Sequence, residues 1–268
     1  MKGFPTITSL VLVACTTTSA FAAECSDTAS GFDAWKAAFA SEARANGIGD
    51  AGLIALASTA YAKKTIAADR NQKSFKLSFN EFMAKRGGPA IVAKGKRLKA
   101  KNAELFARIE REYGVPAGPL LAIWGMETGF GGFLGDQNTL SAVATLAFDC
   151  RRTAFFSEQL VAALALVDLG VIEGKSIGAM HGEIGQTQFL PLNVLKYGVD
   201  GNGDGRIDLV GSSADALAST ANFLKGHGWT PGAGYQVDQP NFVALEGWNA
   251  AEVYQKAIAA MGAEIDGE

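Results

Sequence analysis

Beyond its first 23 residues, the sequence lacks an apolar run long enough to cross a bilayer. The best later candidate, Leu160 to Ile172, carries Asp168 near its end, and a membrane-spanning helix needs about 20 predominantly apolar residues. We therefore expect no transmembrane segment in the mature chain.

Positive charge and histidine are also scarce. The 24 lysines and arginines are outnumbered by 27 aspartates and glutamates, which gives a net charge of −3, and the only histidines are His181 and His227. A mildly acidic chain argues against nucleic acid as the main partner. Neither histidine is spaced with other ligands as in a zinc site.

The first 23 residues have the features of a secretory signal. Lys2 precedes a short apolar run, Leu10 to Ala14, and small residues follow up to Ala23. Loss of Lys2 lowers the basic residues to 23 against 27 acidic ones, a net charge of −4. The alternative is a lipoprotein signal, because Leu12 to Cys15 has the residue order that precedes lipid attachment.

Cysteine is limited to three positions, and one of them, Cys15, lies in the signal segment. Two cysteines would then remain, and in an oxidising compartment such a pair is expected to form a disulfide. We therefore predict a bond between Cys25 and Cys150.

Apolar residues recur at helical spacing through most of the chain. From Phe32 to Tyr113 the pattern is helical throughout, with one stripe that includes Phe75, Phe79 and Phe82. Later segments predicted to be helical are Thr139–Phe148, Phe155–Leu169, Asp215–Trp229 and a final helix from about Asn249. These patterns predict a mainly α protein.

A single ionisable residue, Glu127, lies within the apolar segment Leu120 to Gly132. Burial disfavours the charged form of a carboxyl group, so we expect a raised pKa and a proton that can be donated near neutral pH. Glycines follow at once and should end the helix at the mouth of a cleft. A buried glutamate satisfied by a neighbouring hydroxyl or amide is the alternative.

The segment Gly182 to Pro191 has the composition of a sugar-binding loop. Gln186 and Gln188 can each donate and accept hydrogen bonds, and Phe189 can cover the apolar face of a sugar. A polar loop without a ligand is the alternative.

The segment Asp200 to Leu209 resembles a calcium-binding loop, with oxygen-bearing side chains at alternate positions and a glycine at the turn. Its twelfth position is Gly211 instead of a glutamate, and a later carboxylate would have to close the cage. The predicted ligands are Asp200, Asn202, Asp204, the carbonyl of Arg206, Asp208 and Asp215. An aspartate-rich turn that binds no ion is the alternative.

Six motifs in order, IWGMETGFG, ATLAFDCRR, GEIGQTQFLP, KYGVDGNGDGRIDL, ANFLKGHGW and WNAAEVY, together resemble the membrane-bound lytic murein transglycosylase B family (glycoside hydrolase family 103). The resemblance runs from about Phe32 to the last helix. It implies a lysozyme-like fold within one catalytic domain, residues 24–268. A core lobe would span about 114–229, surrounded by a helical lobe of 24–113 plus the C-terminal helices.

The same resemblance assigns roles to residues of this chain. Glu127 would be the catalytic acid and base, and the aspartate loop would hold a structural Ca²⁺. Substrate contacts are expected from Gln186, Gln188, Phe189, Tyr197, Asn249 and Tyr254. Two departures affect expected contacts: Leu192 stands where many members have a serine, and Ala179 where some have one.

The activity implied is cleavage of peptidoglycan glycan strands with formation of a 1,6-anhydromuramic acid end, by a periplasmic monomer without an organic cofactor. The Glu127 motif contains no second acidic residue, so the substrate's acetamido group is expected to take part where other glycosidases use a second carboxylate. Two alternatives remain open: a goose-type lysozyme-like hydrolase, and a non-catalytic, calcium-dependent peptidoglycan-binding protein.

Overall fold

The structure, a computed structural model, describes residues 24–71 and 77–267. The predicted signal segment, with the alternative lipid site at Cys15, lies outside the described residues, and so does Phe75. No helix of the described part is long and apolar enough to cross a membrane.

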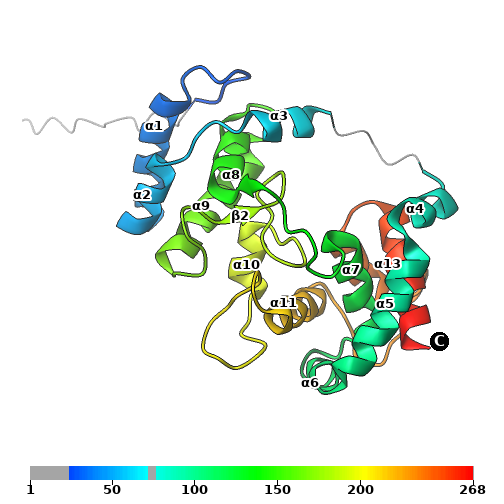
Figure 1. The fold of residues 1–268 in the computed structure, drawn as a ribbon. Helices are drawn as coiled ribbons and strands as arrows, with labels where there is room; N and C mark the ends of the chain where they lie inside the picture. Colours follow the sequence, from blue (N-terminus) through cyan, green and yellow to red (C-terminus); the bar gives the residue numbers. More distant parts are fainter. Residues whose placement is uncertain (1–23, 72–76, 268) are drawn as a thin grey trace, which may run out of the picture.

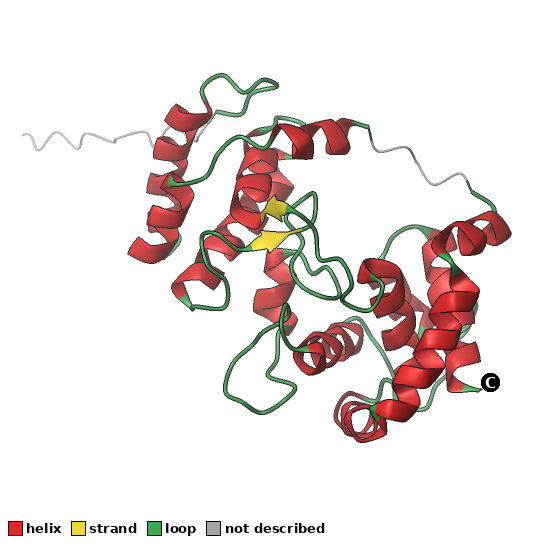
Figure 2. Ribbon diagram, viewed as in Figure 1, coloured by secondary structure: helices red, strands yellow, loops and turns green. Residues whose placement is uncertain are grey.

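Helices dominate the described chain, as Figure 2 shows, so the mainly α prediction is confirmed. The helices before Gly114 are α1 (Phe32–Ala45), α2 (Asp50–Ala57), α3 (Lys63–Arg70), α4 (Phe79–Arg86), α5 (Gly88–Lys101) and α6 (Ala103–Tyr113). The central helices are α7 (Ala117–Thr128), α8 (Thr139–Phe148), α9 (Thr153–Asp168) and α10 (Pro191–Tyr197). The last are α11 (Ser213–Gly226), α12 (Phe242–Trp248) and α13 (Glu252–Asp266).

The only strands in the described part are short: β1 (Gln137–Asn138) and β2 (Ile177–Gly178). They pair antiparallel, with Gln137 opposite Gly178 and Asn138 opposite Ile177. The pair fixes the start of the loop that leads to α10.

Two hydrophobic clusters form the core. One joins α1 and α2 with α8 and α9, and the other joins α5, α6, α7, α11 and α13. Figure 1 shows the corresponding arrangement, with α1 and α2 at one end of the molecule, and α5 and α13 at the other. Residues 24–113 therefore contribute to both clusters, and the predicted lobe boundaries stay a prediction.

The predicted disulfide between Cys25 and Cys150 is present. It joins the segment before α1 to the connection between α8 and α9, and the Ser26 amide donates a hydrogen bond of 2.9 Å to the Phe148 carbonyl beside it. The covalent bond thus holds the first described residues against the α8–α9 pair.

The charged residues beside Cys150 pair with residues of α3. Asp149 forms an ion pair with Arg70, and both Arg151 and Arg152 form ion pairs with Asp69. Asp69 is 2% exposed. A buried carboxylate needs such cationic partners, because an unpaired one is costly in the interior.

Candidate active site

Helix α7 places Glu127 at the edge of a cavity. All the other residues from Ala117 to Thr128 are buried, and Glu127 alone is partly exposed. The helix packs closely on α13, since a Cβ at Gly118 would lie 2.2 Å from the carbonyl oxygen of Gly262. Gly129 ends the helix with a φ of 62°, a conformation that favours glycine.

Two donors from the C-terminal region hold the carboxyl group of Glu127. The Tyr254 hydroxyl donates to Oε1 at 2.7 Å, and Trp248 Nε1 donates to the same oxygen at 3.1 Å. Because both bonds reach Oε1, Oε2 is the oxygen that can carry an acid proton.

Burial raises the pKa of Glu127 above its ordinary value. The hydrogen bonds from Tyr254 and Trp248 and the positive charge of Arg86 act in the opposite direction, and the negative charge of Glu183 adds to the rise. The direction expected from the apolar sequence around Glu127 is therefore present in the fold.

The cavity beside Glu127 has a volume of about 280 Å³. Its lining combines one aromatic wall with polar groups and a second carboxylate, and its members are Glu127, Glu183, Gln188, Phe189, Leu190, Asn193, Phe223, Trp248 and Asn249. Phe189, Phe223 and Trp248 contact one another edge to face, with ring centroids 5.1 to 5.9 Å apart. Such a lining can cover a sugar ring and bind its hydroxyl groups.

The two predicted glutamines differ in position. Gln188 lines the cavity with a φ of 57°, and its Nε2 donates to the Gly185 carbonyl at 2.9 Å. Gln186 does not line the cavity: it is 8% exposed, and its Nε2 donates to the Val210 carbonyl at 3.0 Å. Its own carbonyl accepts a hydrogen bond from the Thr128 hydroxyl at 2.6 Å. Gln186 therefore connects the end of α7 with the segment that contains Val210.

The remaining predicted contacts also separate. Asn249 lines the cavity but precedes α13, where its Oδ1 accepts the Ala251 amide at 2.9 Å, so the last helix begins later than predicted. Tyr254 reaches Glu127 itself. Tyr197 does not line the cavity and packs against Phe223 at 5.0 Å between ring centroids.

Several cavity residues, above all Glu183 and Trp248, are not among the site residues predicted from the sequence. Glu183 lies in the GEIGQTQFLP motif, 56 residues after Glu127, and an acidic residue in a glycine-rich motif was the available signal. The motif around Glu127 has no second acid, but the fold brings one to the same cavity. Trp248 is the first residue of the WNAAEVY motif, next to the predicted Asn249, which was the available signal, but its contact with Glu127 depends on tertiary packing.

The aspartate loop lies on the surface and is folded by its own side chains. Asp200 accepts hydrogen bonds from the amides of Gly203, Asp204 and Gly205. The bond from Gly205 is the main cause of the lowered pKa of Asp200, against which its partial desolvation acts. The oxygens present are the ligand type that calcium prefers.

Asp215 differs from the other predicted calcium ligands because it is fully buried at the start of α11. Its Oδ1 accepts the amides of Gly201 and Asn202 and the Ser212 hydroxyl, and its Oδ2 accepts the Asp208 amide at 2.8 Å. These bonds fasten both ends of the loop to the helix. Across residues 24–71 and 77–267, no three His, Cys, Asp or Glu side chains are grouped so that they could hold a metal ion.

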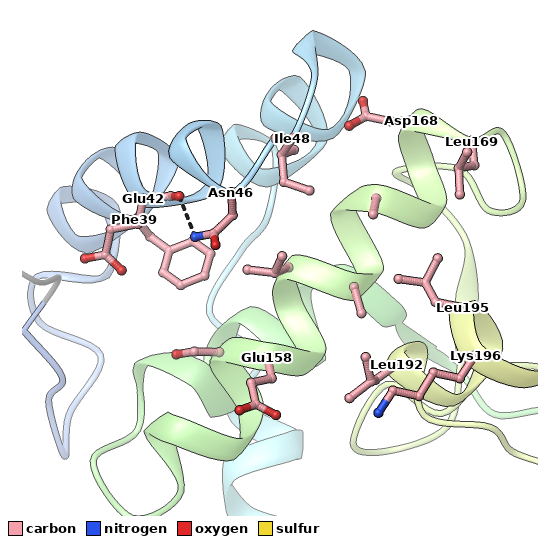
Figure 3. A pocket seen from close by; sticks show the side chains of 15 residues that line it. Phe39, Glu42, Asn46, Ile48, Glu158, Asp168, Leu169, Leu192, Leu195 and Lys196 are labelled. Carbon is pink, nitrogen blue, oxygen red and sulfur yellow. Dashed lines mark hydrogen bonds between the residues drawn. The ribbon is translucent and has the colours of Figure 1, made fainter. Parts of the chain in front are cut away.

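A larger cavity of about 770 Å³ lies between α1, α9 and α10 (Figure 3). Its lining is mostly apolar, from residues such as Phe39, Val161 and Leu195, with Glu158 and Lys196 also among its members. Leu192 faces this cavity, whereas its neighbour Asn193 lines the one beside Glu127. Size alone does not make the larger cavity the site, because neither Glu127 nor its donors reach it.

The chain resembles known peptidoglycan enzymes in sequence and in structure. A family model described as Transglycosylase SLT domain matches residues 31–240. The chain is 38% identical over 122 residues to the membrane-bound lytic murein transglycosylase B of Escherichia coli (strain K12). That alignment covers 45% of this chain and 34% of the relative, so it spans about a third of the relative's length.

Solved structures match over most of the chain. SltB3 from Pseudomonas aeruginosa, in complex with NAG-anhNAM-pentapeptide, matches with a TM-score of 0.81 and 28% identity, covering 88% of this chain and 80% of that one. Lytic transglycosylase Slt35 of Escherichia coli, in complex with calcium, matches with a TM-score of 0.77 and 22% identity, covering 91% and 96%. The predicted lysozyme-like fold is thereby confirmed.

Proposed function

Because the chain belongs to the Transglycosylase SLT domain family, we propose that it is a lytic transglycosylase acting on peptidoglycan. The bond cleaved is the β-1,4 bond between N-acetylmuramic acid and N-acetylglucosamine. The product end is 1,6-anhydromuramic acid.

The observation that carries this proposal is the environment of Glu127. Its carboxyl group has a raised pKa and lies at the edge of a sugar-sized cavity. Two donors bind Oε1, which leaves Oε2 to carry the proton. A group that acts first as acid and then as base needs a pKa near the working pH.

The reaction follows from these contacts. Glu127 gives its proton to the glycosidic oxygen, the bond from that oxygen to the anomeric carbon breaks, and N-acetylglucosamine leaves with a free hydroxyl group. The acetamido group of muramic acid shares the positive charge at the anomeric carbon. The Glu127 carboxylate then takes the proton of the C6 hydroxyl group of the same muramic acid, while the C6 oxygen forms a bond to the anomeric carbon. No water is consumed.

Substrate contacts come from the cavity lining in this proposal. Gln188 and Asn249 offer amide groups to sugar hydroxyls, and Phe189 forms part of the aromatic wall. Gln186 and Tyr197 lie outside this lining and support it: Gln186 bonds to Thr128 at the end of α7 and to Val210, and Tyr197 packs against Phe223.

A structural calcium ion fits the chemistry of the surface loop. Asp200, Asn202, Asp204 and Asp208 supply side-chain oxygens, and Arg206 supplies a carbonyl oxygen. Asn202 Nδ2 donates to Asp204 Oδ2 at 3.0 Å, so these side chains would rearrange around the ion. Calcium bound there would stabilise the fold by mass action and take no part in the chemistry.

We propose the periplasm as the compartment. The signal-like first 23 residues and the disulfide between Cys25 and Cys150 favour an oxidising compartment outside the cytoplasm. Lipid attachment at Cys15 stays the alternative, and a monomer is the expected state.

A hydrolase is the second candidate, and Glu183 is the observation that favours it. Glycosidases that hydrolyse their substrate ordinarily use two carboxylates at one site, and Glu183 lines the same cavity as Glu127. A carboxylate there could activate a water molecule. Only the product end separates the two reactions.

The decisive experiment is mass spectrometry of the soluble products after the mature protein is incubated with purified peptidoglycan. Glu127→Gln is the test variant, and Glu104→Gln, an exposed residue of α6, is the matched control. We expect anhydromuropeptides from the wild type and from the control, and a loss of about 10³-fold in their rate of release by Glu127→Gln.

Other products would assign another function. Reducing muramic acid ends from the wild type would make the protein a hydrolase. Wall binding without release of any fragment would make it a binding protein. Near wild-type release by Glu127→Gln would contradict the role of Glu127.

A further inference from the structure

Glu183 has the position and the fixed geometry of a working group. It lines the cavity beside Glu127, and its side chain is 23% exposed. The His181 amide donates to Oε2 at 2.9 Å, and His181 Nδ1 lies 3.2 Å from Oε1. The Glu183 carbonyl accepts the Ala179 amide at 2.9 Å, so both its main chain and its side chain are held.

Ionisable side chains connect Glu183 with helix α3. His181 Nε2 is 4.0 Å from Oδ1 of the buried Asp69 on α3, and Asp69 is paired with Arg151 and Arg152. The Thr65 hydroxyl, also on α3, donates to the Met180 carbonyl at 2.8 Å. The loop that carries Glu183 is therefore fastened to α3 and, through Asp69, to the connection between α8 and α9.

The two carboxyl groups differ in their favoured protonation. Burial raises the pKa of Glu127, as described above. Burial acts in the same direction on Glu183, but the hydrogen bonds and charge of His181 outweigh it, so the pKa of Glu183 lies below its ordinary value. Paired groups whose environments separate their pKa values are typical of an acid and an ionised partner at one site.

We propose that Glu183 is a second catalytic residue, whose carboxylate stabilises the positive charge that develops on the muramic acid ring as Glu127 protonates the leaving oxygen. The proposal rests on the proposed function. Glu183 forms and breaks no bond: the proton moves between Glu127 and the two sugar oxygens, and the bond to the leaving oxygen is replaced by the bond to the C6 oxygen.

The physical basis is electrostatic. A fixed negative charge in a partly water-excluded cavity stabilises a developing cation more than it stabilises the neutral substrate, so it lowers the barrier and has little effect on binding. His181 and the Asp69 cluster hold that charge in place before the substrate arrives.

The test compares Glu183→Gln and Glu183→Ala with the wild type and with Glu104→Gln in the full mature protein. We expect Glu183→Gln to lower kcat by about 10²-fold with KM nearly unchanged. Formate, a small carboxylate, should partly restore turnover to Glu183→Ala and should not restore it to Glu127→Gln.

The pH profile supplies a readout that a merely structural role would not change. The charge of Glu183 raises the pKa of Glu127, while Arg86, Tyr254 and Trp248 act to lower it. Removal of that charge by Glu183→Gln should therefore move the alkaline limb of the kcat/KM profile to lower pH. The titratable His181 and the cationic Arg152 are the neighbours whose electrostatics act on Glu183, and both are unchanged in the variant.

Failure of this inference is distinct from failure of the proposed function. If the wild type releases anhydromuropeptides and Glu127→Gln does not, but Glu183→Gln retains the wild-type kcat, Glu183 is not catalytic. A loss of activity that follows a lowered melting temperature, without formate rescue and without a shift of the alkaline limb, would also overturn it.

Discussion

Tyr254 limits how far burial can raise the pKa of Glu127, because its hydroxyl donates to Oε1 and favours the charged form. Tyr254→Phe removes that bond, so the pKa of Glu127 should rise further. We expect the alkaline limb of kcat/KM to move to higher pH and kcat at neutral pH to fall about tenfold, because the carboxylate is a less well-positioned base. Steady-state rates across pH measure both effects.

Tyr61→Phe is the matched control for this change. Tyr61 packs against Phe32 in the other hydrophobic cluster. The pH profile of kcat/KM for Tyr61→Phe should coincide with that of the wild type. An alkaline limb of Tyr254→Phe displaced to lower pH would contradict the role of the hydroxyl group.

The ionised form of Glu127 should also lower the stability of the folded protein. Because its pKa is raised in the folded protein, the folded state binds the proton more tightly, and stability falls as pH rises from the ordinary carboxyl pKa through the raised value. Glu127→Gln keeps an acceptor for Tyr254 and removes the charge. Its melting temperature should exceed that of the wild type at about pH 8, and the difference should vanish near pH 4. Calorimetry at both pH values tests this, and equal differences would contradict it.

At the residue scale, sequence predicts what depends on nearby neighbours. Glu127 could be identified because apolar residues flank it within one helix. Trp248 lies 121 residues away, and although it belongs to the WNAAEVY motif, no local pattern shows that it contacts Glu127. Gln186 was predicted as a substrate contact, but its side chain turns toward Val210, and the local sequence does not determine that direction.

Among the elements, the aspartate loop and α11 depend on Asp215. Asp215→Ala would leave the amides of Gly201, Asn202 and Asp208 without their acceptor. We expect the free energy of unfolding to fall by about 3 kcal/mol with or without calcium, because a buried charged acceptor is lost. Urea unfolding followed by circular dichroism measures it. A change below about 0.5 kcal/mol would show that the loop is held by other contacts.

The proposed calcium binding by the same loop leads to a separate prediction. Chelation should lower the melting temperature of the wild type and leave the chemistry of the still-folded protein unchanged. Asp204→Ala alters an exposed side chain, so in the presence of chelator its stability should match that of the wild type, and calcium should then add little. A full calcium-dependent gain in Asp204→Ala would argue against this loop as the site.

Helices in long segments with a regular apolar pattern were predictable, and isolated helices of about two turns were not. Thr139–Phe148 is helical with the predicted bounds, because it is a run of ten largely apolar residues of which all but Ser141 are buried. Helix α12 has seven residues, which is too short for a clear period, and its absence from the prediction moved Asn249 into the next helix. Tertiary packing sets the end of α12 and the start of α13.

At the scale of the whole molecule, the Cys25–Cys150 bond joins positions 125 residues apart. Its existence followed from the number of cysteines, but its place beside α8 and α9 required the fold, because Phe32, Trp35 and Phe148 pack together there. On the chain-entropy model, closing so long a loop stabilises the folded state by about 4 to 5 kcal/mol.

The double variant Cys25→Ser/Cys150→Ser should therefore melt about 10 °C lower than the wild type. The Glu127 cavity is lined by residues of α7, of the loop before α10, of α10 itself, and of α11 and α12. None of these elements carries either cysteine, so turnover at 25 °C should change less than twofold. Calorimetry and peptidoglycan release measure the two quantities, and reduction of the wild type should reproduce the same fall in melting temperature. If turnover fell together with stability, the packing of α1 against α8 would be needed to hold the Glu183 loop in place, since Asp69 and Arg152 connect the two regions.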